Sequence, residues 1–200
     1  MSIQTVVLAA GASSRMGSPK ALLDLDGATF MSRIAVTARA AGSSGVMIVI
    51  GPPDGNAIKA KLPVGTVSVW NPDPSPGMIT SVQAAVASLP RGTAAMLVWP
   101  VDLPQVKQET VRRIMDGVPG KIIVPRHQGK GGHPVRLPRT LFAELAGLPS
   151  DAGLRGLLEA HPGAVVYVDV DDPGVVEDVD TPADHAQAQG KSEKPAKRAK

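Results

Sequence analysis

The chain has 200 residues, a length that suits one domain with a sizeable core and is short for two. It contains no cysteine, which excludes disulfides and thiolate-bound metals, and it has no apolar run long enough to span a bilayer. The formal charge of +3 misleads, because the last ten residues hold five of the 21 basic side chains and one of the 18 acidic ones.

Without that basic end the formal charge is −1, which gives no reason to expect a nucleic-acid partner. We expect a domain over residues 1–188 and a disordered, solvated tail over residues 189–200, because the tail has nothing to bury. No basic region followed by a hydrophobic stretch begins the chain, so no secretory signal is expected. The absence of cysteine fits a cytoplasmic protein, and no membrane partner is expected.

Short β-branched runs alternate with helical patterns along the chain, which predicts an α/β protein. Several of the strand-like runs are continuously apolar, as expected for parallel strands covered on both faces. We therefore predict a three-layer α/β/α sandwich around a mostly parallel, Rossmann-like sheet. The expected strands are Thr5–Leu8, Val46–Ile50, Thr66–Val69, Ala95–Val98, Ile122–Val124 and Val165–Val168. The expected helices are Thr29–Ala41, Asn56–Lys61, Met78–Ser88, Gln105–Met115, Arg139–Leu145, Gly153–Glu159 and Pro182–Gln187.

The loop after the first expected strand is the most informative segment. It is made of small residues from Ala9 onward, and it carries Arg15 and Lys20. Small residues let backbone N–H groups approach an anion closely, and the two cations add charge that suits a polyphosphate. The loop therefore predicts a nucleoside triphosphate site.

Two familiar phosphate motifs do not fit this loop. A P-loop requires Gly-Lys-Ser/Thr, whereas Gly17 is followed by Ser18-Pro19-Lys20. A dinucleotide fingerprint fails at its second glycine, which is Ser13 here. An ordinary strand-to-helix turn is the remaining alternative, but such turns usually have about 2–6 residues.

Asp102 follows the expected strand Ala95–Val98 and lies between Pro100 and Pro104. A carboxylate at the carboxyl end of a strand suits Mg²⁺, which binds few carboxylates together with substrate phosphates and water. An N-cap role for the next helix is the alternative, but two residues separate Asp102 from Gln105.

Later segments carry weaker signals. The helix start at Gly77–Ser81 can bind an anion or a base edge, although Thr80 or Ser81 can instead cap the helix. His133 follows a basic loop over residues 126–130 that suits an anionic second substrate, or it is a solvated loop residue. Asp169, Asp171 and Asp172 form an acidic turn that we expect to be solvated.

The strings LAAGASSRMGSPK (residues 8–20), GMITS (77–81), PVDLP (100–104), GHPV (132–135), DAGLR (151–155) and DVDTP (178–182) occur in one order. This ordered set resembles nucleotidyltransferases with a glycosyltransferase-A-like (nucleotide-diphospho-sugar transferase) fold. It is most similar to molybdenum cofactor cytidylyltransferases and their molybdopterin-guanine-dinucleotide relatives. The likeness runs from about Ile3 to His185.

The resemblance implies roles for individual residues. Arg15, Lys20 and Asp102 are the expected catalytic residues, with Asp102 as the Mg²⁺ ligand. Asp180 is a candidate second ligand, although some relatives carry Asn there, and His133 is the candidate acceptor contact. The expected nucleotide contacts are Leu8, Ala9, Ala10, Gly11, Arg15, Lys20, Gly77, Ser81 and Pro100. Ala10 stands where guanylyl-transferring relatives have Gly, which favours a pyrimidine base and hence CTP.

The expected activity is transfer of CMP from CTP to the phosphate of a molybdopterin-type acceptor, with release of pyrophosphate. A recipient molybdoenzyme is a possible further partner. No serine or cysteine nucleophile motif is present, which is consistent with direct transfer. The alternatives are a guanylyltransferase, a sugar- or alcohol-phosphate nucleotidylyltransferase, and a non-catalytic nucleotide-binding chaperone for the molybdenum cofactor.

Overall fold

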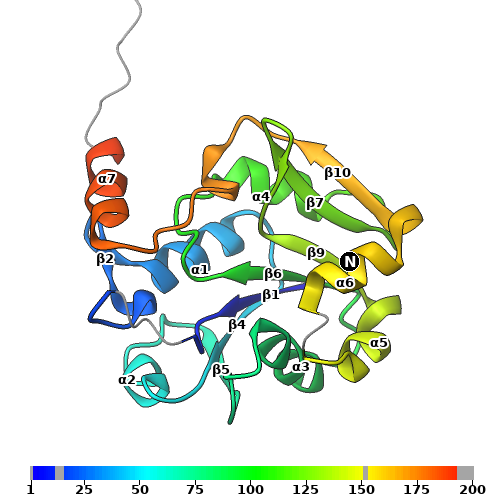
Figure 1. The fold of residues 1–200 in the computed structure, drawn as a ribbon, viewed down its shortest axis with the longest axis horizontal. Helices are drawn as coiled ribbons and strands as arrows, with labels where there is room; N and C mark the ends of the chain where they lie inside the picture. Colours follow the sequence, from blue (N-terminus) through cyan, green and yellow to red (C-terminus); the bar gives the residue numbers. More distant parts are fainter. Residues whose placement is uncertain (1, 12–15, 151–152, 193–200) are drawn as a thin grey trace, which may run out of the picture.

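The structure is a computed structural model and describes residues 2–11, 16–150 and 153–192. A central sheet of eight strands runs through this part of the chain in the order β10-β7-β9-β6-β1-β4-β5, with β8 paired to β7 (Figure 1). β9 pairs antiparallel to β6 and β7, whereas β10–β7 and β6–β1–β4–β5 pair in parallel. The strands are β1 (Ile3–Leu8), β4 (Gly45–Ile50), β5 (Thr66–Trp70), β6 (Ala95–Pro100), β7 (Ile122–His127), β8 (Lys130–Gly131), β9 (Val135–Pro138) and β10 (Val165–Asp169).

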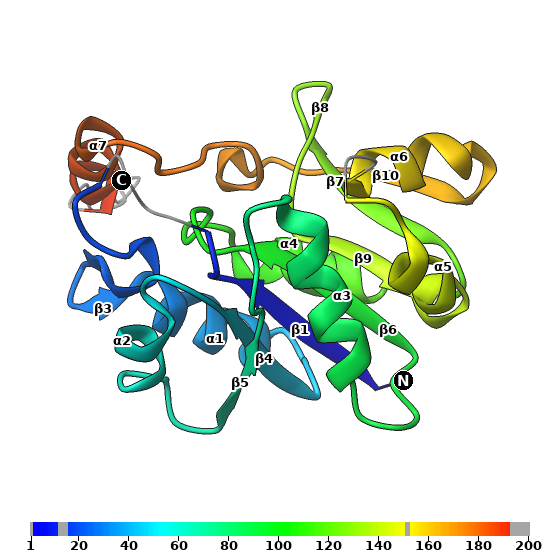
Figure 2. The same cartoon turned by 60° about the horizontal axis from the view of Figure 1, so that its bottom comes forward.

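Helices cover both faces of this sheet, as predicted. One apolar cluster joins the sheet to α1 (Phe30–Ala40) and α4 (Gln108–Met115), and a second joins it to α3 (Met78–Ser88), α5 (Phe142–Gly147) and α6 (Gly153–Ala160). The two helical layers lie on opposite sides of the sheet in Figures 1 and 2. The remaining helical elements are α2 (Gly55–Lys59), α7 (Pro182–Ser192) and the 3-10 turns Lys20–Leu22, Arg139–Leu141, Pro162–Ala164 and Pro173–Val175.

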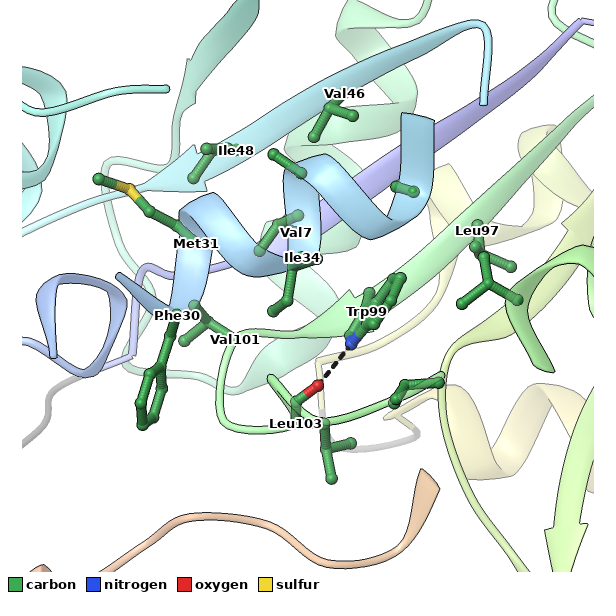
Figure 3. Close-up of a cluster of buried hydrophobic side chains, with 14 of the residues drawn as sticks. Val7, Phe30, Met31, Ile34, Val46, Ile48, Leu97, Trp99, Val101 and Leu103 are labelled. Carbon is green, nitrogen blue, oxygen red and sulfur yellow. Dashed lines mark hydrogen bonds between the residues drawn. The ribbon is translucent and has the colours of Figure 1, made fainter. Parts of the chain in front are cut away.

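Alternating residues of a central strand pack against the helical layers on opposite faces of the sheet. Val7 faces α1 and belongs to the first cluster, whereas its neighbour Val6 belongs to the second. Trp99 is fully buried against the α1 side, and its indole Nε1 donates to the carbonyl oxygen of Leu103 at 3.0 Å (Figure 3). This bond satisfies the one polar group of the ring and ties the end of β6 to the loop that carries Asp102.

Four strands were not predicted, namely β2 (Asp24–Leu25), β3 (Ala28–Thr29), β8 and β9. β8 belongs to a hairpin with β7, and β2 pairs with β3 in a small separate hairpin. β9 is bounded by proline and contains Arg136, a pattern that does not suggest a central strand. Arg136 is 2% exposed, and its guanidinium donates to the carbonyls of Met115 (3.2 Å) and Gly117 (2.6 Å) at the end of α4.

The expectation of a solvated acidic turn is wrong for Asp172, which is 2% exposed. Its Oδ2 accepts from the backbone N–H of Lys107 at 2.9 Å, and its Oδ1 accepts from that of Gly174 at 3.1 Å. Helix α4 begins at Gln108 rather than at the expected Gln105, and Asp172 satisfies the backbone N–H of Lys107, the residue that precedes the helix. Asp169 does lie at the surface, where it pairs with Arg126 at 2.7 Å.

Replacing Asp172 with alanine is expected to lower the free energy of unfolding by about 2–3 kcal/mol, because the buried N–H of Gly174 and the partly buried N–H of Lys107 lose their acceptor. Urea unfolding followed by circular dichroism measures this loss. Asp171→Ala is the matched control, since its side chain is exposed and is expected to cost less than about 0.5 kcal/mol. Equal stabilities of the two variants would contradict the structural role of Asp172.

The C-terminal helix α7 reaches Ser192, four residues past the expected domain end at residue 188. Its start was correctly predicted, because Thr181 Oγ1 accepts from the backbone N–H of Asp184 at 3.2 Å and Asp184 returns a bond to Thr181 N. The rest of the expected tail, residues 193–200, lies outside the described residues. Among the described helices, none combines the length and apolar character that a bilayer crossing requires.

Candidate active site

A cavity of about 390 Å³ lies beyond the carboxyl ends of β1 and β6, between the loops that follow β1, β5 and β6. Leu8 and Pro100 are register partners on the adjacent strands β1 and β6, so the loops that follow them begin side by side. Ten sequence-predicted site residues line this cavity, namely Leu8, Ala9, Ala10, Gly11, Lys20, Gly77, Ser81, Pro100, Asp102 and Asp180. Arg15 falls outside the described residues, so its predicted role stays a prediction.

The structure adds lining residues that sequence reasoning did not assign. Ile58, Pro74, Met78, Val101 and Asp178 also line the cavity. Pro74 belongs to the proline-rich loop after β5, and Met78 belongs to the helix start at Gly77–Ser81 that the sequence pointed to. Asp178 lies in the same motif as Asp180 and was assigned no role. Ile58 comes from α2 and carried no sequence signal.

Lys20, Asp102 and Asp180 meet at one point of this cavity. The ammonium Nζ of Lys20 lies 3.4 Å from Asp102 Oδ2 and contacts Asp180 Oδ1. Asp102 and Asp180 lie 82 and 160 positions after Lys20 in the sequence. The side chains of Lys20, Asp102 and Asp180 are only 15%, 28% and 28% exposed, respectively. The cationic loop after β1 and the acidic loop after β6 therefore meet in the structure.

Backbone hydrogen bonds hold the Asp180 side chain close to Lys20. The backbone N–H of Val179 donates to the carbonyl oxygen of Asp102 at 2.8 Å, which fixes the segment before α7 against the loop after β6. Lys20 begins a short 3-10 turn after Pro19, and the N–H of Leu22 closes that turn on the Pro19 carbonyl at 2.9 Å. Both anchors are main-chain bonds, so the side chains of Lys20 and Asp180 project from fixed backbone positions.

Burial raises the pKa of the Asp102 carboxyl, and the neighbouring carboxylates of Asp180 and Asp178 raise it further. The Lys20 ammonium opposes this effect by attraction and hydrogen bonding. The site thus gathers negative charge that a cation stabilises. Within residues 2–11, 16–150 and 153–192, no three His, Cys, Asp or Glu side chains form a ready-made metal cluster. Two carboxylates that leave the other positions to phosphate and water fit Mg²⁺ better than a metal held by protein alone.

The far side of the cavity is built around Asn71, a buried residue that follows β5 directly. Its Nδ2 donates to Thr80 Oγ1 at 2.9 Å and to Ser81 Oγ at 3.0 Å. Gly77, with a φ of 129°, is the N-cap residue of α3, and Thr80 Oγ1 donates to the Gly77 carbonyl oxygen at 2.9 Å. The capping alternative is therefore wrong, and Asn71 instead fixes Ser81 at the cavity wall. Its position at the carboxyl end of a strand was the signal that could have identified it.

A second cavity of about 240 Å³ adjoins the first and shares Met78, Pro100, Asp102 and Asp178 with it. His133 and Lys130 line this second cavity. The expected basic loop is a β7–β8 hairpin.

Part of the charge expected from that hairpin is already paired. Arg126 bonds Asp169 through two contacts, at 2.7 and 2.9 Å, which leaves Lys130 as the hairpin cation that lines the cavity. His133 is fixed by its backbone N–H, which donates to the carbonyl oxygen of Val175 at 2.9 Å. The second cavity thus offers an acceptor less positive charge than the sequence suggested.

Burial lowers the pKa of His133 to about 4, so its imidazole is neutral at pH 7. An unfolded histidine has a pKa near 6.5, so between about pH 6.5 and 4 the unfolded state binds the proton that the folded state rejects. Stability therefore falls as the pH drops through this window, by up to about 3 kcal/mol. His133→Gln is expected to flatten this pH dependence in urea unfolding at pH 4.5, 5.5 and 7.5, whereas a parallel decline in both proteins would contradict it.

The mostly parallel sheet with its antiparallel β9, and the cation and aspartates at its carboxyl edge, define a nucleotidyltransferase of the glycosyltransferase-A-like class. Residues 5–165 match the model of the MobA-like NTP transferase domain. The chain belongs to this family.

Individual relatives agree with this assignment. The molybdenum cofactor cytidylyltransferase of Escherichia coli (strain K12) is 27% identical over 188 residues, which covers 93% of this chain and 95% of that protein. The purine catabolism protein PucB of Bacillus subtilis (strain 168) is 26% identical over 189 residues, covering 90% of this chain and 92% of PucB.

The crystal structure of Rv0371c from Mycobacterium tuberculosis H37Rv superimposes with a TM-score of 0.82 at 34% identity, covering 94% of this chain and 97% of that one. A complex of Rv0371c with manganese gives a TM-score of 0.77 at 32% identity, with coverages of 95% and 99%. The likeness thus extends over nearly the whole of both chains.

Proposed function

We propose that this protein transfers a nucleotidyl group, CMP from CTP, to the phosphate monoester of a molybdopterin-type acceptor and releases pyrophosphate. The observation that carries the proposal is the meeting of Lys20 with Asp102 and Asp180 inside one cavity at the carboxyl edge of the sheet. The whole-length similarity to a molybdenum cofactor cytidylyltransferase supports the choice of nucleotide and acceptor. A cytoplasmic location belongs to the same proposal.

In this reaction an acceptor phosphate oxygen forms a bond to the α-phosphorus of the triphosphate, and the bond from that phosphorus to the β-bridging oxygen breaks. The attacking phosphate has a second pKa of about 6 and is already mostly dianionic at pH 7, so no protein base has to remove a proton. The residues therefore contribute position and charge rather than proton transfer.

The residues that line the cavity are proposed to bind different parts of the triphosphate. The ammonium of Lys20 neutralises the β,γ-phosphates and the charge that grows on the leaving pyrophosphate. The backbone from Leu8 to Gly11 borders the phosphates, and Arg15 is proposed to add a second cation. Ser81, held by Asn71, lies on the wall proposed for the base.

Asp102 and Asp180 are the residues that would hold Mg²⁺, since both present carboxylate oxygens to one cationic position. When bound, the metal ion neutralises phosphate oxygens and orients the triphosphate. The manganese complex of Rv0371c supports a divalent cation in this family. The choice of Mg²⁺ for this chain is part of the proposal.

The second cavity is the proposed acceptor site, because it opens on the first beside Asp102. A neutral, partly buried His133 suits a hydrogen bond to a heterocyclic part of the acceptor better than an ion pair with a second phosphate. Lys130 remains available at its rim for a charged group. A pterin-like acceptor with one phosphate matches this distribution of charge.

The test is a pyrophosphate-release assay with each of the four common ribonucleoside triphosphates, Mg²⁺ and purified molybdenum cofactor. We expect release with CTP that depends on the acceptor. Preferred use of GTP would indicate a guanylyltransferase, and turnover with a sugar or alcohol phosphate alone would replace the acceptor. Nucleotide binding without release under any condition would instead favour a non-catalytic carrier.

Replacing Ala10 with glycine is expected to weaken the preference for CTP over GTP about tenfold, because a methyl group in a close-fitting pocket is worth roughly that factor. Ala10 is 3% exposed and lines the cavity. The ratio of kcat/KM for the two nucleotides measures the effect. Unchanged discrimination would remove Ala10 from the basis of base selection.

A further inference from the structure

The ammonium of Lys20 sits in the position between two carboxylates that a divalent cation would need. It hydrogen-bonds Asp102 Oδ2 at 3.4 Å and also Asp180 Oδ1. Asp178 lines the same cavity as Lys20, Asp102 and Asp180 and adds a third acidic side chain. In the described chain, Lys20 thus provides positive charge at the point where the Asp102 and Asp180 oxygens converge.

An ammonium and a divalent cation cannot both occupy this position. Mg²⁺ needs its oxygen ligands at about 2.0–2.1 Å, whereas two positive charges about 4 Å apart repel strongly in a partly buried site. A metal ion that enters alone must displace the ammonium and leave it in surroundings where its side chain is only 15% exposed. Breaking a partly buried ion pair in this way is costly.

A triphosphate changes this balance, because it offers the displaced ammonium new partners. Lys20 lines the main cavity, where the phosphates are proposed to lie, and its flexible four-carbon stem lets the head group turn while the backbone stays fixed. The turn that holds its backbone is closed by Leu22 N to Pro19 O at 2.9 Å and Leu23 N to Lys20 O at 3.1 Å.

We propose that Lys20 is a displaceable counter-ion, which holds the metal position in the nucleotide-free protein and moves to the phosphates when metal and nucleotide bind together. This inference rests on the proposed function, since it uses the same site. It predicts that the free protein binds divalent metal weakly because of Lys20. It also predicts that removing the ammonium strengthens metal binding even though it removes a group needed for transfer.

The experiment titrates the full chain with Mn²⁺ alone, without nucleotide, and measures free Mn²⁺ by electron paramagnetic resonance. Lys20→Met removes the charge and keeps the length of the side chain, and we expect it to bind Mn²⁺ at least tenfold more tightly than the wild type. Lys121→Met removes the same charge at a distant site, where Lys121 bonds the Gly163 carbonyl, and is expected to change the affinity less than twofold.

The double variant Lys20→Met, Asp102→Asn tests where the gain in Mn²⁺ affinity arises. The gain should disappear in this variant if the metal ion binds between the carboxylates of Asp102 and Asp180. If circular dichroism shows that Lys20→Met folds poorly, Lys20→Gln replaces it, with the same expected gain in Mn²⁺ affinity. Affinity in the lysine variants equal to or below the wild type, or a gain that survives Asp102→Asn, would overturn the inference.

The proposed function is tested separately by the wild-type assay. Pyrophosphate release without a gain in Mn²⁺ affinity rejects the counter-ion role alone. A gain without release by the wild type rejects the function and leaves the counter-ion role standing.

Discussion

Replacing Asp102 with asparagine is expected to slow CTP-dependent pyrophosphate release by about a thousandfold or more, equivalent to roughly 4 kcal/mol of lost transition-state stabilisation. Asparagine keeps the size and one oxygen of the side chain but removes the negative charge that the metal ion and Lys20 both use. The measurement is kcat/KM for the nucleotide at saturating Mg²⁺ and acceptor. Asp171→Asn, which removes an exposed carboxylate, is expected to retain wild-type activity.

The effect of Asp102→Asn on the free energy of unfolding distinguishes a loss of catalysis from a loss of folding. The pKa of Asp102 is raised, mainly by burial, so its charged form is less favourable in the folded state than in the unfolded state. For a carboxyl group with a raised pKa, stability falls as pH rises through the window between the unfolded and folded values. At pH 7 Asp102→Asn should therefore unfold at the wild-type urea concentration or a higher one. Retained turnover, or a loss of activity that parallels a loss of stability, would remove the catalytic assignment.

The sequence was sufficient for the architecture because the central strands are largely apolar and almost completely buried. β1, β4 and β6 are apolar almost throughout and lie in the centre of the sheet, where both faces pack against helices. The segments that escaped prediction depend on tertiary contacts. Arg136 in β9 becomes acceptable in a core only because the carbonyl groups at the end of α4 surround it, and nothing local to its sequence shows that.

The same reasoning explains which parts of the site could be foreseen. Lys20 and Asp102 follow strands that are adjacent in the sheet, so the general rule for parallel sheets placed both at one edge. The resemblance supplied Asp180, but its actual contact is an ion pair with Lys20 that no motif records. Asp172 was misjudged because a cluster of three acidic residues suggests solvent. Its burial follows from a long-range bond to Lys107, 65 positions away.

Replacing Lys20 with alanine is expected to reduce kcat for pyrophosphate release by about a hundredfold to a thousandfold, the range found when one preorganised charge or donor is removed from a transition state. Lys20→Arg should restore little, because the planar guanidinium is bulkier and more rigid than the ammonium between Asp102 and Asp180. Lys61→Ala, at an exposed position, is the matched control and should keep wild-type kcat. A rise in KM with unchanged kcat would mean that Lys20 binds ground state and transition state equally.

Substitution of Lys20 is expected to change turnover and Mn²⁺ affinity in opposite directions. A general loss of structure cannot produce both changes together. If Lys20 neutralises both the carboxylates of the free protein and the phosphates of the bound nucleotide, its removal must weaken catalysis and strengthen the binding of metal alone. A misfolded variant would lose both properties, and a surface lysine would change neither. Opposite changes in turnover and in Mn²⁺ affinity are therefore the specific consequence of one ammonium group shared between two sets of anions. Both effects are expected to depend on Asp102, because its carboxylate is the partner that Lys20 gives up.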